Sequence, residues 1–171
     1  MPEPAASTSL FRGAWVRVDR EEWPGIDPRE VVRVHDAAAV LPVTPSGDVL
    51  LVRQFRPAAR RAVLEIPAGL LDVEGEEPAE CAARELYEET GHRAASIDRL
   101  AGIFPSPGSW TEFVHIFVAR AGAEPEGAPE DGIEVIRRPL SEMVAEARAG
   151  RIDDAKTALA LLLADARTGP G

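Results

Sequence analysis

The sequence has one cysteine, no long apolar segment and a deficit of positive charge, and each of these features excludes a class of protein. Because Cys81 is the only cysteine, no disulfide can form within the chain. The longest apolar run, 158–164, is far shorter than the ~20 residues that a membrane-spanning helix requires. A formal net charge of −10 gives no electrostatic attraction to nucleic acid. With no apolar signal segment near residue 1, these absences predict a soluble cytoplasmic protein.

Histidine is also scarce, and its placement argues against a histidine-based metal site. His35, His92 and His115 lack the close spacing of metal ligands, so we interpret them as structural or surface residues. What the chain does have is an ordinary globular balance of 45% hydrophobic and 28% charged residues. A length of 171 residues is enough for one domain with its own core.

The order of strand-like and helix-like segments predicts an α/β fold. We expect residues 1–9 to form a disordered lead and residues 20–29, with Trp23-Pro24-Gly25, to form a turn-rich connection. Strands surrounding one central helix, followed by two terminal helices, indicate an α/β sandwich with a mixed sheet. The expected strands are 11–18, 31–34, 38–44, 49–55, 63–66, 97–104, 113–119 and 133–137, and the expected helices are 78–90, 141–150 and 153–166.

The central helix has an unusual density of carboxylates. Pro78 suits its first turn and Gly91 suits its end. Glu85, Glu88 and Glu89 are three and four residues apart, so their side chains converge on one side of the helix. Such a helix can be a solvated acidic face, partly neutralised by an ion pair between Arg84 and Glu88. It can also hold a hard divalent cation, Mg²⁺ or Mn²⁺, through carboxylate oxygens.

The complete segment from Gly69 to Gly91 resembles the Nudix box. That pattern is Gly, five residues, Glu, seven residues, and then Arg-Glu-aliphatic-x-Glu-Glu-x-Gly. The chain keeps the seven-residue gap between Glu76 and Arg84 and every position downstream, but six residues separate Gly69 from Glu76. The resemblance implies a Nudix-like α/β/α sandwich with a mixed sheet, in which the box forms a catalytic loop-helix-loop. It also implies hydrolysis of a phosphoanhydride.

Further segments resemble the ADP-ribose pyrophosphatase branch of that family. Pro107 lies sixteen residues beyond Gly91, within Ser106-Pro107-Gly108. This placement resembles that of the proline that marks the branch. The segments 50–58, 64–69 and 150–155 are also similar to that branch. Together these features span roughly residues 38–166, and they place Pro107 and Gly108 among the expected substrate-binding residues.

The resemblance implies metal-binding and phosphate-binding roles for individual residues. Glu85 and Glu89 would bridge Mg²⁺ ions, Glu88 would assist one of them, and the carbonyl of Ala68 would supply a further oxygen. Arg84 would orient the carboxylates through a salt bridge. Arg53 and Arg56 are expected to contact the diphosphate oxygens of the substrate. Glu112 is expected to form a hydrogen bond with its sugar.

The general base is expected outside the box. In this branch it comes from a mobile acidic loop near the last strand, which here is 124–131. Glu130 is the first candidate, followed by Asp131 and Glu126. We therefore expect the catalytic residues to be Glu130, Asp131, Arg84 and Glu88.

The N-terminal segment is expected to complete the site in a homodimer. In the same branch this segment crosses to a second subunit, and adenine needs a flat apolar partner. Trp15 and Trp23 are the candidates for that partner. We expect residues 10–37 to form N-terminal strands exchanged between subunits and residues 38–167 to form the Nudix domain.

The resulting functional prediction is a Mg²⁺-dependent enzyme that converts ADP-ribose to AMP and ribose 5-phosphate. One alternative keeps the chemistry and changes the substrate to another nucleotide sugar, such as GDP-mannose, or a dinucleoside polyphosphate. A second is a Nudix module that binds a nucleotide metabolite without cleaving it. A third, a purely structural acidic helix, predicts no stabilisation by metal.

Overall fold

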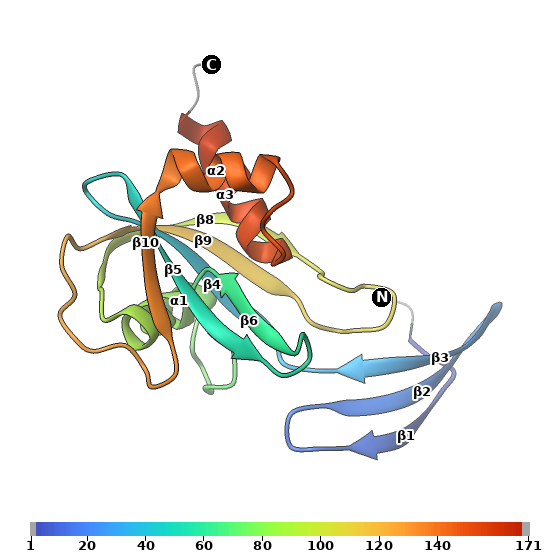
Figure 1. Ribbon diagram of the computed structural model, residues 1–171. Helices are drawn as coiled ribbons and strands as arrows, with labels where there is room; N and C mark the ends of the chain where they lie inside the picture. The colour runs from blue at the N-terminus through green and yellow to red at the C-terminus, as the bar shows by residue number, and fades with distance from the viewer. Residues whose placement is uncertain (1–2, 169–171) are drawn as a thin grey trace.

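The computed structural model describes residues 3–168, and its centre is a mixed β-sheet (Figure 1). Seven strands form this sheet, with the path β10-β5-β4-β9-β8, while β6 pairs with β5 and β7 pairs with β4. Strands β4 and β9 are parallel and the other pairs are antiparallel, as predicted for a mixed sheet. The strands are β4 (Ala37–Val43), β5 (Asp48–Arg56), β6 (Arg61–Glu65), β7 (Ala68–Leu70), β8 (Ala94–Ile103), β9 (Val114–Ala121) and β10 (Glu134–Pro139).

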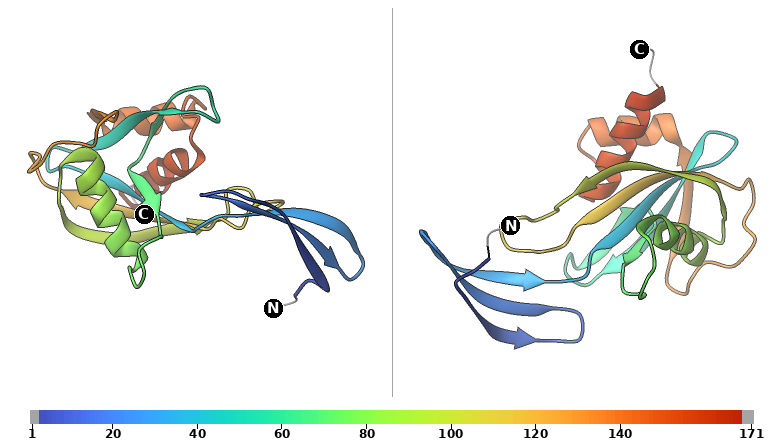
Figure 2. Two further views of the ribbon diagram at one scale, coloured as in Figure 1. Left: turned by 90° about the horizontal axis from the view of Figure 1, so that it is seen from below. Right: turned by 180° about the vertical axis from the view of Figure 1, so that it is seen from behind.

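Helices cover both faces of the sheet (Figure 2). Helix α1 (Pro78–Thr90) packs on one face, and α2 (Leu140–Arg148) and α3 (Ala155–Thr168) pack on the other. Both faces of the sheet must be covered because strand β4 directs apolar side chains to each of them. Its Ala39 and Leu41 join the core under α2 and α3, whereas Ala38 and Val40 join the core under α1. The predicted α/β/α sandwich is confirmed, and no helix within residues 3–168 is long and apolar enough to cross a membrane.

The N-terminal segment forms a separate three-stranded antiparallel sheet that projects from the sandwich (Figure 1). Its strands are β1 (Ala6–Arg12), β2 (Arg17–Trp23) and β3 (Ile26–Arg33). The expected strand over 11–18 spans the β1–β2 turn, and the expected connection over 20–29 is a hairpin. The disordered lead expected over 1–9 is a strand from Ala6 onward; Met1 and Pro2 lie outside the described residues. Because β1 is exposed along its whole length, it has no apolar alternation from which a strand could be predicted.

Backbone hydrogen bonds join this projecting sheet to the loop after β8. The Val32 N–H donates to the carbonyl of Ser109 at 2.7 Å, and the Thr111 N–H donates to the carbonyl of Val32 at 3.0 Å. The loop that contains Pro107 therefore lies against β3 and links the two sheets.

Candidate active site

Local sequence signals determine where helix α1 begins and ends. Pro78 stands in the first turn, and Glu77 and Glu80 form a reciprocal capping box there. Gly91 ends the helix with φ = 73°, a left-handed conformation that glycine adopts without strain. The helix predicted over 78–90 is thus confirmed at both ends, and it presents Glu85, Glu88 and Glu89 from neighbouring turns.

Arg84 lies among the acidic residues of the box. Its guanidinium contacts Glu76 at 2.8 Å, Glu85 at 2.5 Å and Glu88 at 2.9 Å. The hydrogen bond from Arg84 lowers the pKa of Glu76 below its usual range. Within residues 3–168, no group of three His, Cys, Asp or Glu side chains is arranged to hold a metal ion as it stands. The guanidinium thus places a positive charge among three carboxylates, and its role in orienting them stays a prediction.

Glu85 and Glu89 lie against the short strand β7. A Cβ atom on Gly69 would be 1.9 Å from Oε1 of Glu85, so any side chain at position 69 would force this carboxylate to move. The Ala68 N–H donates to Oε2 of Glu89 at 3.2 Å. The predicted metal ligands Glu85 and Glu89 therefore lie next to Ala68 and Gly69, although 16 residues lie between Ala68 and Glu85 in the sequence.

Burial has a strong effect on the charge of these two carboxyl groups. Glu89 is only 5% exposed, and desolvation raises its pKa to about 7, although the hydrogen bond from Ala68 acts in the opposite direction. Desolvation also raises the pKa of Glu85, against the lowering effect of Arg84. Two carboxyl groups that resist ionisation side by side are typical of a site that a cation completes.

A cavity of about 450 Å³ adjoins β7, and we call it the box cavity. It is lined by Ala68 and Gly69 together with charged side chains from β5, β6, the start of α3 with the residue before it, and the loop before β9. These are Arg56, Glu65, Lys156, Asp154 and Glu112. Desolvation raises the pKa of Glu112. The structure thus brings the predicted substrate residues Arg56 and Glu112 to the predicted metal ligand Ala68.

Arg56 is held in a fixed orientation by the buried carboxylate of Glu65. Nε and Nη2 of Arg56 donate to the two oxygens of Glu65 at 2.7 and 3.0 Å. Lys156 also bonds to Glu65 and contacts Asp154 at 3.0 Å. Sequence reasoning missed Lys156; the available signal was that it is the only lysine of the chain and directly follows the segment 150–155, which resembles the family branch.

The remaining predicted residues of this group lie outside the box cavity. Arg53 pairs with Glu134 across β5 and β10 at 3.0 Å, and both side chains are about half exposed or more. Glu130 and Asp131 do not line the cavity. The Glu130 N–H nevertheless donates to the carbonyl of Glu88 at 2.9 Å, and the charge of Glu130 contributes to the raised pKa of Glu85. Glu130 is therefore the loop carboxylate that the structure places near the box.

The aromatic and Ser-Pro-Gly residues gather around the projecting sheet. A cavity of about 370 Å³, which we call the hairpin cavity, is lined by Trp23, Arg29, Arg33, Trp110 and the predicted residues Pro107 and Gly108. Trp15 lines a different cavity at the β1–β2 turn and is 72% exposed. Pro105 and Glu112 line the box cavity, so the two ends of one loop reach it while the middle of that loop reaches the hairpin cavity.

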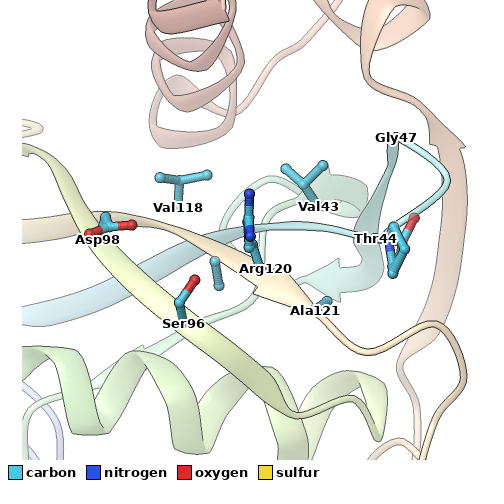
Figure 3. A pocket seen from close by; sticks show the side chains of 10 residues that line it. Val43, Thr44, Gly47, Ser96, Asp98, Val118, Arg120 and Ala121 are labelled. Carbon is cyan, nitrogen blue, oxygen red and sulfur yellow. The ribbon is translucent and has the colours of Figure 1, made fainter.

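Another cavity, of about 500 Å³, lies at the opposite ends of β4 and β9 (Figure 3). It is lined by Val43 and Val118, with Arg120 between them in this view and with Ser96 and Asp98 from β8. None of the predicted site residues lines it. Of these two cavities it is the box cavity, although slightly smaller, that is lined by the predicted residues Arg56, Ala68 and Glu112.

Comparisons with known proteins agree with this geometry. The sequence model of the NUDIX domain matches residues 33–161. The chain belongs to the Nudix family. An ADP-ribose pyrophosphatase of Bacillus subtilis (strain 168) is 39% identical over 137 residues, which cover 78% of this chain and 74% of that protein. A GDP-mannose pyrophosphatase of Yersinia enterocolitica is 36% identical, covering 80% and 78%. A methanol dehydrogenase activator of Bacillus methanolicus is 34% identical, covering 89% and 86%.

These relatives confirm the predicted branch and the prediction of a Nudix pyrophosphohydrolase. Nudix hydrolases generally need a divalent metal ion, and the oxygen-rich donor set of this one suits a hard cation. The residues that would hold it are Glu85, Glu88, Glu89 and the carbonyl of Ala68. Their fit rests on the adjacency of Glu85 and Glu89 to β7 and on the raised pKa of both carboxyl groups.

Proposed function

We propose that this Nudix hydrolase cleaves the diphosphate of ADP-sugars, prefers ADP-ribose, and releases AMP and ribose 5-phosphate. One observation carries the proposal. The box cavity places the cationic side chains of Arg56 and Lys156 beside Ala68 and Gly69, against which the box carboxylates pack. A diphosphate in this cavity would lie between these positive side chains and strand β7, against which Glu85 and Glu89 pack.

Mg²⁺, with Mn²⁺ as a substitute, is the proposed cofactor. The proposed ligands are Glu85, Glu89 and Glu88 together with the carbonyl of Ala68. When bound, the cations supply Lewis-acid polarisation of the diphosphate oxygens. Arg84 would then keep its two hydrogen bonds to Glu76, at 2.8 and 3.0 Å, and release the carboxylates that bind metal.

Arginine and lysine side chains are proposed to bind the diphosphate. Arg56 is the first of these, because its paired hydrogen bonds to Glu65 fix the plane of the guanidinium before substrate arrives. Lys156 adds a second positive charge to the same cavity. Arg53 would first have to leave Glu134. That exposed pair is worth at most about 1 kcal/mol, so a phosphate oxygen can replace it.

The hydrolytic step needs a base for water. We assign this role to Glu130, with Asp131 and Glu126 as the other candidates in the same loop. As the water oxygen bonds to one phosphorus, the bond between that phosphorus and the bridging oxygen breaks. The base takes the proton of the water, and the bridging oxygen leaves with the second phosphate. Glu88 would act as a metal ligand in this step.

The nucleoside is proposed to extend toward the hairpin cavity. Trp23 offers a flat apolar surface for the base there, next to Pro107 and Gly108. Glu112, at the box-cavity end of the same loop, is in a position to accept a hydrogen bond from a ribose hydroxyl. This arrangement gives Pro107 and Gly108 the substrate-selecting role that their sequence context predicts.

A homodimer is proposed because the projecting sheet exposes large apolar side chains. Leu10, Phe11, Trp15 and Ile26 are each more than half exposed, and β1 is an edge strand of its sheet. We propose that this sheet contacts a second subunit and that Trp15 is covered there. Sedimentation at working concentration is expected to give the mass of a dimer, and a monomeric mass would contradict this arrangement.

The test of the proposed function is hydrolysis of a substrate panel with Mg²⁺, resolved by anion-exchange chromatography. The panel contains ADP-ribose, ADP-glucose, GDP-mannose, NADH, a diadenosine polyphosphate and 8-oxo-dGTP. We expect AMP and ribose 5-phosphate to be released from ADP-ribose faster than products from any other compound. The Yersinia relative is named as a GDP-mannose pyrophosphatase. Preference for GDP-mannose would be compatible with the proposed metal site but would refute the use of Pro107 as a marker of ADP-ribose specificity. If none of the compounds is cleaved with Mg²⁺ or Mn²⁺, the alternative of a Nudix module that binds a nucleotide metabolite without cleaving it would be favoured.

A further inference from the structure

The acidic loop between β9 and β10 is attached to the end of helix α1. The N–H groups of Glu126 and Gly127 both donate to the carbonyl of Gly91, at 2.8 and 3.2 Å. The Glu130 N–H donates to the carbonyl of Glu88 at 2.9 Å. Sequence reasoning predicts a mobile loop here, but its backbone caps the terminal carbonyls of the helix that bears the metal-binding residues. The position of the loop is therefore tied to the position of that helix.

Close packing accompanies these hydrogen bonds. A Cβ atom on Gly91 would be 2.1 Å from the carbonyl oxygen of Gly127. A Cβ atom on Gly127 would be 2.9 Å from the hydroxyl oxygen of Tyr87 and 3.1 Å from its Cζ. The guanidinium of Arg93 covers the same ring at 4.2 Å from its centroid. We call the contact of Tyr87, Gly91 and Gly127 the tyrosine clasp.

Electrostatics explains why the loop needs such an attachment. It carries Glu124, Glu126, Glu130 and Asp131 and approaches a helix end that carries three more glutamates, so the charges alone would separate the two. An ion pair between the loop and the segment that follows the helix, Arg93 with Glu126 at 3.0 Å, is 62% exposed on both sides and contributes little. Backbone hydrogen bonds and the fit of Gly127 against Tyr87 hold the loop, together with an exposed hydrogen bond from Arg137 to the carbonyl of Ala123 at 3.3 Å.

We propose that the tyrosine clasp is a positioning device, in which Tyr87 and Gly127 act as positioning residues that hold Glu130 beside the box. This inference rests on the proposed function only where it names Glu130 as the base. The clasp itself is a property of the fold and can be tested without turnover. Neither Tyr87 nor Gly127 touches the box cavity, so their effect on the reaction passes through Glu130.

The test compares two alanine substitutions in the same loop. Gly127→Ala places a methyl group against the Tyr87 ring, whereas Gly122→Ala is a matched control because its nearest atom would be 3.5 Å away. Neither glycine has a positive φ, so backbone strain does not distinguish them. Gly127→Ala combined with Tyr87→Phe removes the hydroxyl nearest to the new methyl group and tests for rescue.

Hydrogen exchange is the measurement that does not depend on activity. In Gly127→Ala we expect the amides of residues 126, 127 and 130 to exchange faster than in the parent protein, while Gly122→Ala leaves them unchanged. The kcat of Gly127→Ala should fall about tenfold to a hundredfold, as expected for a displaced catalytic group, with KM and the Mg²⁺ titration midpoint within about twofold. The Tyr87→Phe double variant should recover part of both effects.

Each outcome bears on the proposal. Unchanged exchange in Gly127→Ala, or a kcat equal to that of Gly122→Ala, would overturn it. If Gly127→Ala does not fold, Tyr87→Ala takes its place, and it must accelerate the same three amides for the proposal to stand. If the parent protein hydrolyses none of the panel compounds, the proposed function fails, whereas accelerated exchange in Gly127→Ala would still support the clasp.

Discussion

The buried carboxyl group of Glu89 makes the stability of the metal-free protein depend on pH. Its pKa is raised from an ordinary value of 4.5 to about 7, chiefly by desolvation. Below pH 4.5 the group is protonated in both the folded and the unfolded chain. Between pH 4.5 and about 7 the unfolded chain loses this proton while the folded chain keeps it, so the free energy of unfolding falls as the pH rises. Above about pH 7 the folded protein holds a buried charge.

The magnitude follows from the two pKa values. Their difference, at about 1.4 kcal/mol per pH unit, corresponds to about 3 kcal/mol of stability lost by pH 8. Glu89→Gln removes the charge, and its amide oxygen can still accept the hydrogen bond from Ala68. We therefore expect Glu89→Gln to be more stable than the parent protein at pH 8 by up to about 3 kcal/mol, and equally stable at pH 4.5. For a chain of this size that is a rise in Tm of roughly 6–12 °C.

The assay is thermal unfolding of both proteins in EDTA from pH 4.5 to 8.5, repeated with Mg²⁺. Glu88→Gln is the matched control, because Glu88 is 49% exposed and should not give this gain. Mg²⁺ should raise the Tm of the parent protein at pH 8 more than that of Glu89→Gln, since a ligand of the native state stabilises it. If Glu89→Gln is no more stable than the parent protein at pH 8, Glu89 does not carry the buried charge.

Two further predictions concern the box and its base. Gly69→Ala places Cβ 1.9 Å from Glu85, so this carboxylate must move; we expect Mg²⁺ affinity, measured by calorimetry, to fall by about tenfold or more. Gly122→Ala serves again as the control, and equal Mg²⁺ affinities would show that the close approach is irrelevant to metal binding. Glu130→Gln should lower kcat by about a hundredfold or more with Mg²⁺ affinity retained. Unchanged turnover would remove Glu130 from the mechanism.

Neighbouring arginines show where sequence reasoning stops. Arg53 and Arg56 belong to one strand and were both expected at the diphosphate. Arg53 pairs with Glu134 of β10, whereas Arg56 pairs with Glu65 of β6 and lines the box cavity. The difference depends on which strands flank β5 and on the face each residue occupies. Neither is a local property of the segment.

The projecting sheet marks a second limit. Its strands are mostly exposed and polar, and their positions follow from backbone pairing between β1, β2 and β3 rather than from a buried face. A strand is readable in a sequence only where burial imposes an apolar pattern, either an alternation or a short continuous run. Strand β4, with its core residues on both faces, and β5 were predicted to within a residue or two for that reason.

What the sequence by itself determined is the box. The cap residues of α1, the spacing of Glu85, Glu88 and Glu89, and the family pattern are all local, because a helix fixes the direction of its side chains within two turns. The tertiary structure decided what surrounds it. Lys156 reaches Glu65 from 91 positions away, and Glu130 approaches Glu88 through a backbone hydrogen bond between segments 42 positions apart. Such contacts form only when the sheet brings its strand ends together. They therefore cannot be predicted from the spacing of residues within the chain.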